Sequence, residues 1–205
     1  MGRLKTDQTK DYQLKPRYLV KILAGVDEVG RGSLIGPVYA AAVILNKSIN
    51  KKFLKDSKSL SKKKREELYS YIKKNCIWAI GQSSVKEIEK LNILNASLLA
   101  MKRAILKLTK KPSLILIDGN KLPDLKNYKL EYVIRGDQKI PSISAASIIA
   151  KVSRDRFITT LSKQFNNYGW DTNSGYGTKE HLRAIKKFGI TKYHRKTFSP
   201  ISDLL

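Results

Sequence analysis

Four carboxylates stand at the ends of three apolar runs in a chain that is otherwise rich in lysine and arginine. Asp27 and Glu28 close the first run, Asp118 closes a second, and Asp137 follows a third. Clustered Asp and Glu supply the hard oxygen ligands that Mg2+ and Mn2+ prefer. Two such ions, about 3.5–4 Å apart, activate a water and stabilise the charge on a phosphodiester that is being cut. The pattern therefore predicts metal-dependent phosphodiester hydrolysis, provided that the runs are strands whose ends share one edge of a sheet.

Each carboxylate also has an ordinary interpretation when it is taken alone. Asp118 before a glycine suits a turn, Asp137 after a glycine suits a turn or a cap, and Asp27 with Glu28 suits two solvated charges. Successive strand residues point to opposite faces of a sheet. Glu28 therefore joins Asp27 in one site only if the strand ends between them, or if Glu28 acts through its backbone.

The overall charge points to a polyanionic partner. Among 205 residues, 41 Lys and Arg stand against 17 Asp and Glu, which gives a formal charge of +24. Phosphates gain from each neutralising cation and release counterions, so nucleic acid is the first candidate and an anionic membrane surface the second. A proteome biased toward lysine is the alternative source of this charge. The single cysteine, Cys76, excludes an internal disulfide and a site of several thiolates.

The elements that must position these residues follow from the apolar patterns. Apolar runs predict strands over residues 18–26, 38–45, 77–82, 114–117 and 131–135, and helical patterns cover 61–74, 144–163 and 178–188. A capping box at Ser84 and Glu87 precedes an apolar stripe of helical spacing over 91–108, which Asn92 divides into two. Strands that alternate with helices predict an α/β fold with a mixed sheet. We expect a basic arm over 1–17 and one domain over 18–205, helical from about 166.

Several longer motifs, in order along residues 20–200, resemble ribonuclease HII. The motifs are Ala24-Gly25-Val26-Asp27-Glu28-Val29-Gly30-Arg31-Gly32, Leu54-Lys55-Asp56-Ser57-Lys58-Ser59-Leu60, Asn92-Ile93-Leu94-Asn95-Ala96, Asp118-Gly119, Gly136-Asp137, Ser144-Ala145-Ala146-Ser147-Ile148-Ile149-Ala150-Lys151-Val152-Ser153-Arg154-Asp155, Gly175-Tyr176-Gly177 and His194-Arg195-Lys196-Thr197-Phe198. The sequence departs from the usual pattern at Gln138, Pro141 and Asn173-Ser174.

The resemblance implies a fold, an activity and a set of site residues. The fold is a ribonuclease H-like mixed sheet flanked by helices, with a small helical C-terminal part. The activity is metal-dependent cutting on the 5′ side of ribonucleotides in DNA duplexes and RNA–DNA hybrids, which leaves a 3′-hydroxyl and a 5′-phosphate. The implied residues are the metal-binding and catalytic carboxylates Asp27, Glu28, Asp118 and Asp137, and the substrate-binding residues Gly30, Arg31, Gly32 and Tyr176.

The same resemblance sets expectations for cofactors, partners and location. Mg2+ or Mn2+ is the expected cofactor, and the expected partners are RNA–DNA hybrids and duplex DNA that contains ribonucleotides, as in ribonucleotide excision during DNA repair. A monomer in the cytoplasm, without membrane contact, is expected because no secretory signal is visible in the polar N-terminal residues. The alternatives are a non-catalytic basic nucleic-acid-binding protein, a DNA-specific nuclease on the same fold, and a degenerate enzyme kept as a binder.

Other polar residues have weaker claims to function. His181 and His194 suit structural roles or phosphate contacts better than acid–base catalysis, since two-metal chemistry requires neither. Lys139, Lys151 and Arg154 suit either contacts to a nucleic-acid backbone or a solvated basic face. Asp155 is expected to pair with Lys151, four residues earlier on a helix.

Overall fold

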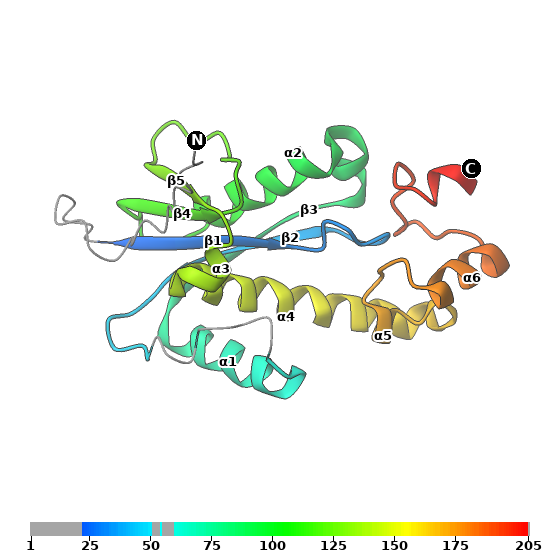
Figure 1. Ribbon diagram of the computed structural model, residues 1–205, viewed down its shortest axis with the longest axis horizontal. Coiled ribbons are helices and arrows are strands. Elements are labelled where there is room, and N and C mark those ends of the chain that lie inside the picture. The colour runs from blue at the N-terminus through cyan, green and yellow to red at the C-terminus, as the bar shows by residue number, and fades with distance from the viewer. Residues whose placement is uncertain (1–21, 51–53, 55–59, 205) are drawn as a thin grey trace, which may run out of the picture.

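The computed structural model describes residues 22–50, 54 and 60–204, and these residues form an α/β fold around one five-stranded sheet (Figure 1). The strands are β1 (Leu23–Val29), β2 (Val38–Ile44), β3 (Ile77–Ser83), β4 (Leu114–Asp118) and β5 (Leu130–Val133). The predicted arm over 1–17 and the first residues of the predicted strand over 18–26 lie outside the described residues.

The sheet is mixed, as predicted, with the strand order β3-β2-β1-β4-β5. The pairs β1–β2 and β2–β3 are antiparallel, whereas β1–β4 and β4–β5 are parallel. Every residue of β2 is buried, which explains its unbroken run of apolar side chains. Because β1, β4 and β5 run in the same direction, their carboxyl ends share one edge of the sheet.

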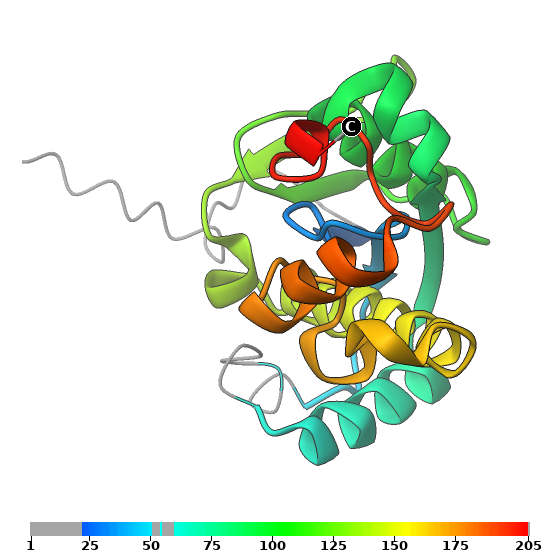
Figure 2. The same cartoon turned by 90° about the vertical axis from the view of Figure 1, so that its right-hand side faces the viewer.

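Helices cover both faces of the sheet (Figures 1 and 2). One face carries α2 (Val85–Leu106), and the other carries α4 (Pro141–Gln164), with α1 (Lys62–Asn75) packed outside α4. The short α3 (Gly136–Lys139) precedes α4, and the helices α5 (Trp170–Asn173) and α6 (Lys179–Phe188) lie beyond its far end. Short 3-10 turns occupy Asn166–Tyr168 and Ser202–Leu204. No helix in the described ranges is long and apolar enough to cross a membrane.

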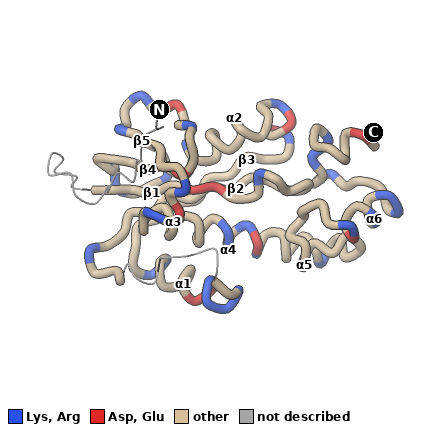
Figure 3. The backbone as a smooth tube through the Cα atoms, in the orientation of Figure 1, with Lys and Arg blue, Asp and Glu red and all other residues tan. Residues whose placement is uncertain are grey.

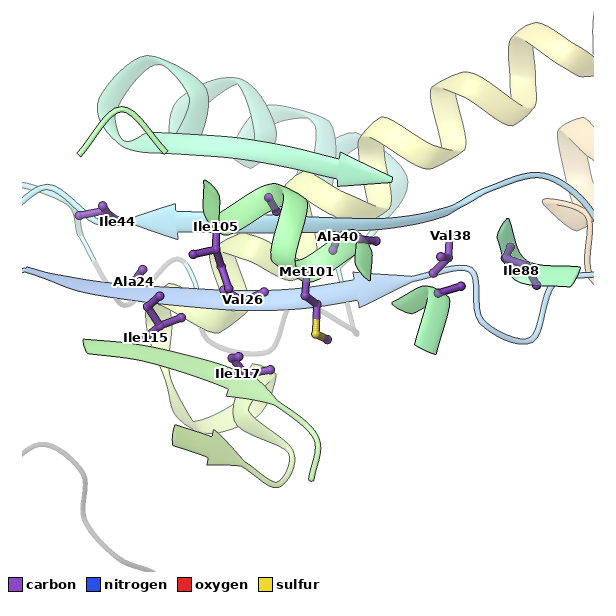
Figure 4. Packing of buried hydrophobic residues seen from close by; sticks show 14 residues of the cluster. Ala24, Val26, Val38, Ala40, Ile44, Ile88, Met101, Ile105, Ile115 and Ile117 are labelled. Carbon is purple, nitrogen blue, oxygen red and sulfur yellow. The ribbon is translucent and has the colours of Figure 1, made fainter. Parts of the chain in front are cut away.

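Glycines let the helices approach both faces of the sheet closely. A Cβ at Gly25 would lie 2.2 Å from the backbone of Ser142 in α4, and one at Gly81 would lie 2.1 Å from the carbonyl oxygen of Ala100 in α2. Apolar side chains fill the rest of the α2 face, where Met101 and Ile105 pack over the sheet (Figure 4). The backbone therefore fixes how α2 and α4 are seated on the strands.

Helix α2 is divided as its sequence predicts. The Ser84 side chain accepts from the Glu87 amide, and the Glu87 carboxylate accepts from the Ser84 amide, which completes the capping box. Asn92 has φ 66° and ψ 166°, so the helical path breaks there. The Asn92 side chain accepts a hydrogen bond of 3.1 Å from the Asn95 amide and starts the second part of the helix.

Three predicted boundaries were wrong by a few residues. Strand β1 runs to Val29, past Asp27 and Glu28, because β2 continues to pair with it up to Val29 and Tyr39. Strand β5 ends at Val133, since Arg135 takes a left-handed conformation with φ 54°. Helix α4 begins at Pro141, where a proline suits the first turn because its missing amide hydrogen is not needed.

The helical C-terminal part shares a core with the loop that follows β1. Leu34 and Ile35 from this loop pack with Ile158 of α4 and with Trp170 and Ile185 of the following helices. The backbone of Ile35 also forms a β-bridge with His194. The loop is thus held between the sheet and the last part of the chain.

Candidate active site

The strand order brings three of the four predicted carboxylates to one edge of the sheet. Parallel pairing joins Val26 of β1 to Ile117 of β4, so Asp27 and Asp118 follow at the same level. On the β4 side this pairing stops at Val26, although β1 continues along β2. Beyond Val26, Asp27 and Glu28 therefore no longer pair with β4, on the side of β1 that faces Asp118. The sequence alone could not establish this arrangement.

These three carboxylates are close enough for their charges to interact. Burial raises the pKa of Asp27 well above its ordinary value, and the charges of Glu28 and Asp118 raise it further, against a hydrogen bond from Ser147. Burial also raises the pKa of Glu28, although Arg31 opposes this shift. The Asp27 carboxylate accepts a hydrogen bond of 2.7 Å from the Glu28 amide. Three acidic groups therefore crowd the end of β1 and β4, where burial and mutual repulsion disfavour their charged forms.

Asp137 reaches the same edge of the sheet through the residue before it. The Gly136 amide donates a 2.6 Å hydrogen bond to the Asp118 carboxylate. A Cβ at Gly136 would lie 2.5 Å from Ile143 and 3.3 Å from this carboxylate oxygen, so a side chain would crowd both. Asp137 itself is buried, with 2% of its surface exposed.

The donor chemistry of this edge suits a divalent cation, although the protein's own groups hold some of the oxygens. Glu28 is paired with Arg31 at 3.2 Å, and Asp118 accepts from the Gly136 amide. Within the described part of the chain, no three His, Cys, Asp or Glu side chains are arranged to hold a metal ion. Cation binding would thus compete with Arg31 for Glu28 and would relieve the repulsion among the carboxylates.

The predicted substrate-binding residues lie together beside these carboxylates. Gly30 follows β1 with φ 90°, and a Cβ at Gly32 would lie 3.8 Å from the ring of Tyr176. The Leu34 amide donates to the Gly175 carbonyl at 2.9 Å, which joins the loop to the segment that carries Tyr176. The Tyr176 side chain is exposed, so its ring can meet a ligand. The loop of residues 30–36 and the segment of residues 174–176 therefore form one continuous surface.

Two residues that hold this surface were not recognised from the sequence. Arg154 and Arg195 are completely buried, so the interpretation of Arg154 as a phosphate contact or a solvated charge was wrong. The predicted pair of Lys151 with Asp155 is confirmed at 2.9 Å. The sequence carried a signal only for Arg154, which follows the buried α4 positions Ala146 and Ala150 at helical spacing. Arg195 stands in a basic run, which gave no sign of burial.

The two histidines form a buried network in which both are neutral. His181 Nδ1 lies 2.9 Å from the Tyr176 carbonyl and must donate to it, so its Nε2 accepts from the Trp170 indole at 2.9 Å. His194 Nδ1 accepts from the Thr191 amide at 2.8 Å, which leaves its Nε2–H to donate to His181 at 3.3 Å. Burial lowers the pKa of both side chains, that of His194 to about 4. The histidines are structural, as the sequence favoured.

Basic residues are spread over most of the described elements of the molecule. Figure 3 shows Lys and Arg distributed over helices and loops, whereas acidic segments are few. Three carboxylates at one edge of the sheet would repel a phosphate backbone that the rest of the surface attracts, unless a cation intervenes. This contrast separates the site from a uniformly basic binding face.

Comparisons with known proteins agree on one family. The family model for ribonuclease HII matches residues 24–200. Ribonuclease HII of Pelagibacter ubique is 88% identical over 91% of this chain and 100% of its own length, and that of Coxiella burnetii (strain Dugway 5J108-111) is 54% identical over 89% and 91%. The crystal structure of ribonuclease H2 from Pyrococcus horikoshii OT3 covers 89% of this chain and 96% of its own, at 28% identity and a TM-score of 0.74. The chain belongs to the ribonuclease HII family.

Proposed function

We propose that this endoribonuclease cuts the phosphodiester on the 5′ side of a ribonucleotide in duplex DNA or in an RNA–DNA hybrid, and leaves a 3′-hydroxyl and a 5′-phosphate. Family membership supports the activity. The observation that carries the details is the shared edge of β1 and β4, which sets Asp27, Glu28 and Asp118 beside the Gly30–Gly32 loop. Carboxylates for chemistry and a backbone loop for recognition thus meet at one place.

The carboxylates are proposed to act as metal ligands. Asp27, Glu28, Asp118 and Asp137 would hold Mg2+ or Mn2+, which supplies an activated water and stabilises charge on the scissile phosphate. Arg31 pairs with Glu28 at 3.2 Å, so a cation bound by Glu28 would compete with this ion pair. The Gly136 amide orients one oxygen of Asp118.

The neighbouring loop is proposed to recognise the ribose. The 2′-hydroxyl distinguishes RNA from DNA and lies on the minor-groove side of the duplex, where backbone groups must come close to reach it. Gly30 and Gly32 permit that approach because they carry no side chain. Arg31 is exposed and can donate to a sugar or phosphate oxygen, and the Tyr176 ring can lie against the sugar of the next nucleotide.

We also propose that the protein acts as a monomer in the cytoplasm, in the removal of ribonucleotides during DNA repair. The strong positive charge supports work on nucleic acid rather than on a small substrate. The chief competitor is a basic protein that binds nucleic acid without cutting it. That function leaves the repelling carboxylates at the end of the β1–β4 ladder without a purpose.

A nicking assay tests the proposal. The substrate is a DNA duplex with one ribonucleotide, and an all-DNA duplex runs beside it, with Mg2+, with Mn2+ and with chelator. We expect cutting only 5′ of the ribonucleotide, only with metal, and a loss of about 100-fold or more in Asp118→Asn with duplex binding retained. Salt-sensitive binding without cutting in either metal would favour the non-catalytic binder, and cutting of the all-DNA duplex would favour a DNA-specific nuclease.

A further inference from the structure

Arg154 and Arg195 lie beneath the Gly30–Gly32 loop, and neither is exposed. Every hydrogen bond that the two guanidinium groups make within the described residues goes to a backbone carbonyl. Arg154 Nε and Arg195 Nη2 are buried and have no hydrogen-bond partner among these residues. Burying two cations with incomplete hydrogen bonding carries a large desolvation penalty, and apolar side chains often stabilise a fold equally well.

The carbonyls that the arginines hold belong to the two segments proposed to read the ribose. Arg195 donates to the carbonyls of Arg31 at 2.8 Å and Gly36 at 3.0 Å, so it joins the two ends of the loop of residues 30–36, which contains Gly30–Gly32. Arg154 donates to the carbonyls of Ile35 and Ser174, each at 3.2 Å, so it joins the loop to the Tyr176 segment. Together, the two side chains tie the ends of the loop to each other and tie the loop to the segment that carries Tyr176.

The same arginines also support the side chains and glycines of the site. A Cβ at Gly30 would lie 2.2 Å from Arg154 Nε, so the glycine rests directly on this guanidinium. The Tyr176 ring centroid lies 5.9 Å from Arg154 Cζ, within the range of a cation–π contact. Burial lowers the pKa of both arginines, and for Arg195 the charge of Arg154 adds to this effect. The guanidinium groups stay charged near neutral pH and repel each other.

We propose that Arg154 and Arg195 are positioning residues that fix the distance between the Gly30–Gly32 loop and Tyr176, and so determine how well a ribonucleotide is seated for cutting. This inference rests on the proposed function of the loop and of Tyr176. Each arginine reaches its two carbonyls from two different nitrogens of the planar guanidinium, whereas lysine has only one nitrogen at the end of its side chain. Neither arginine touches the substrate in this arrangement.

The test is the pair Arg195→Lys and Arg154→Lys, which keep the charge and lose the fork. On a duplex with one ribonucleotide, we expect the single-turnover rate to fall about tenfold or more, while Kd for the duplex changes by less than about twofold. The Mg2+ concentration that gives half of the maximal rate should not move, because the carboxylates keep their places. The matched control is Tyr168→Phe, which removes only the hydroxyl that donates a 3.0 Å bond to the Gly189 carbonyl in the same helical part.

Each outcome decides between the possibilities. If the wild-type protein does not cut at the ribonucleotide, the proposed function fails before the arginines are at issue. If the wild-type protein cuts and both folded lysine variants cut at the same rate, the positioning role is overturned. A Tyr168→Phe variant that loses as much rate as the arginine variants would show a general effect of stability. Failure of both lysine variants to fold would assign the arginines to the stability of the whole domain and would also overturn the proposal.

Discussion

The buried pair of His181 and His194 makes the protein sensitive to acid in a predictable window. The pKa of His194 is lowered to about 4 from its ordinary value of 6.5, first by burial and then by the neighbouring His181. An unfolded histidine takes up its proton near pH 6.5, so as pH falls from there the unfolded chain binds a proton that the folded chain refuses. Stability is therefore full above about pH 6.5 and is lost progressively down to about pH 4.

The size of this loss follows from the two pKa values of His194. For a shift from 6.5 to about 4, linkage gives a loss of about 2 kcal/mol at pH 5 and about 3 kcal/mol once pH is below both values. The network explains why the proton is refused. His194 Nδ1 already accepts from the Thr191 amide at 2.8 Å, so a proton placed there would face that donor.

Urea unfolding between about pH 4.5 and 7 measures this effect in the wild-type protein and in His194→Gln. Glutamine can keep a polar contact near Thr191 but does not titrate, and the difference between the two proteins cancels the titration of the carboxylates. We expect the variant to be less stable near pH 7 and the two curves to converge as pH falls. Parallel curves over the whole range would refute the tautomers and the burial that we describe.

Three further predictions follow from the packing, the helix cap and the metal site. Gly25→Ala should lower stability by about 3 kcal/mol, seen as a lower Tm, because its Cβ would meet the Ser142 backbone at 2.2 Å. Gly32→Ala, whose Cβ meets nothing closer than 3.8 Å, should leave Tm unchanged. Equal effects of the two variants on Tm would contradict the close packing of α4. Glu87→Ala should lower the free energy of unfolding in urea by about 1–2 kcal/mol, since it loses the helix cap and the 2.6 Å pair with Arg103. Because the pKa of Glu87 is lowered to about 2, this loss of stability should shrink as pH falls below about 4.5. A loss that does not change with pH would argue against the ion pair. Chelation should stop nicking, and added Mg2+ or Mn2+ should restore it. Nicking that survives chelation would exclude the proposed role of the carboxylates.

The elements of the fold could largely be predicted because their patterns are local. The unbroken apolar run of β2 marked a buried strand, and the capping box with the Asn92 break marked the two parts of α2. Boundaries failed where pairing with another strand decided them, as at Val29, which β2 holds in the sheet. Local propensity contains no information about such partners.

The candidate site was predicted only as a set of residues and not as an arrangement. That Asp27 and Asp118 lie at the same level depends on the parallel pairing of β1 with β4, which joins residues far apart in sequence. The burial of Arg154 could not be foreseen either, because an arginine on a helix is usually exposed. Its partners are carbonyls of two loops, and no sequence pattern identifies a backbone carbonyl as a ligand.

The contacts of Arg195 and His194 with the loop of residues 30–36 have a consequence for the order in which the protein folds. Arg195 donates to the Arg31 carbonyl across a separation of 164 residues, and His194 bridges the loop at Ile35. During synthesis the loop leaves the ribosome long before these contacts exist, so a nascent chain can carry the acidic edge while its recognition surface is still open. The contacts that hold the proposed ribose-reading surface cannot form before Arg195 is made, and a chain shortened before Arg195 is expected to fold its sheet and yet lack this surface.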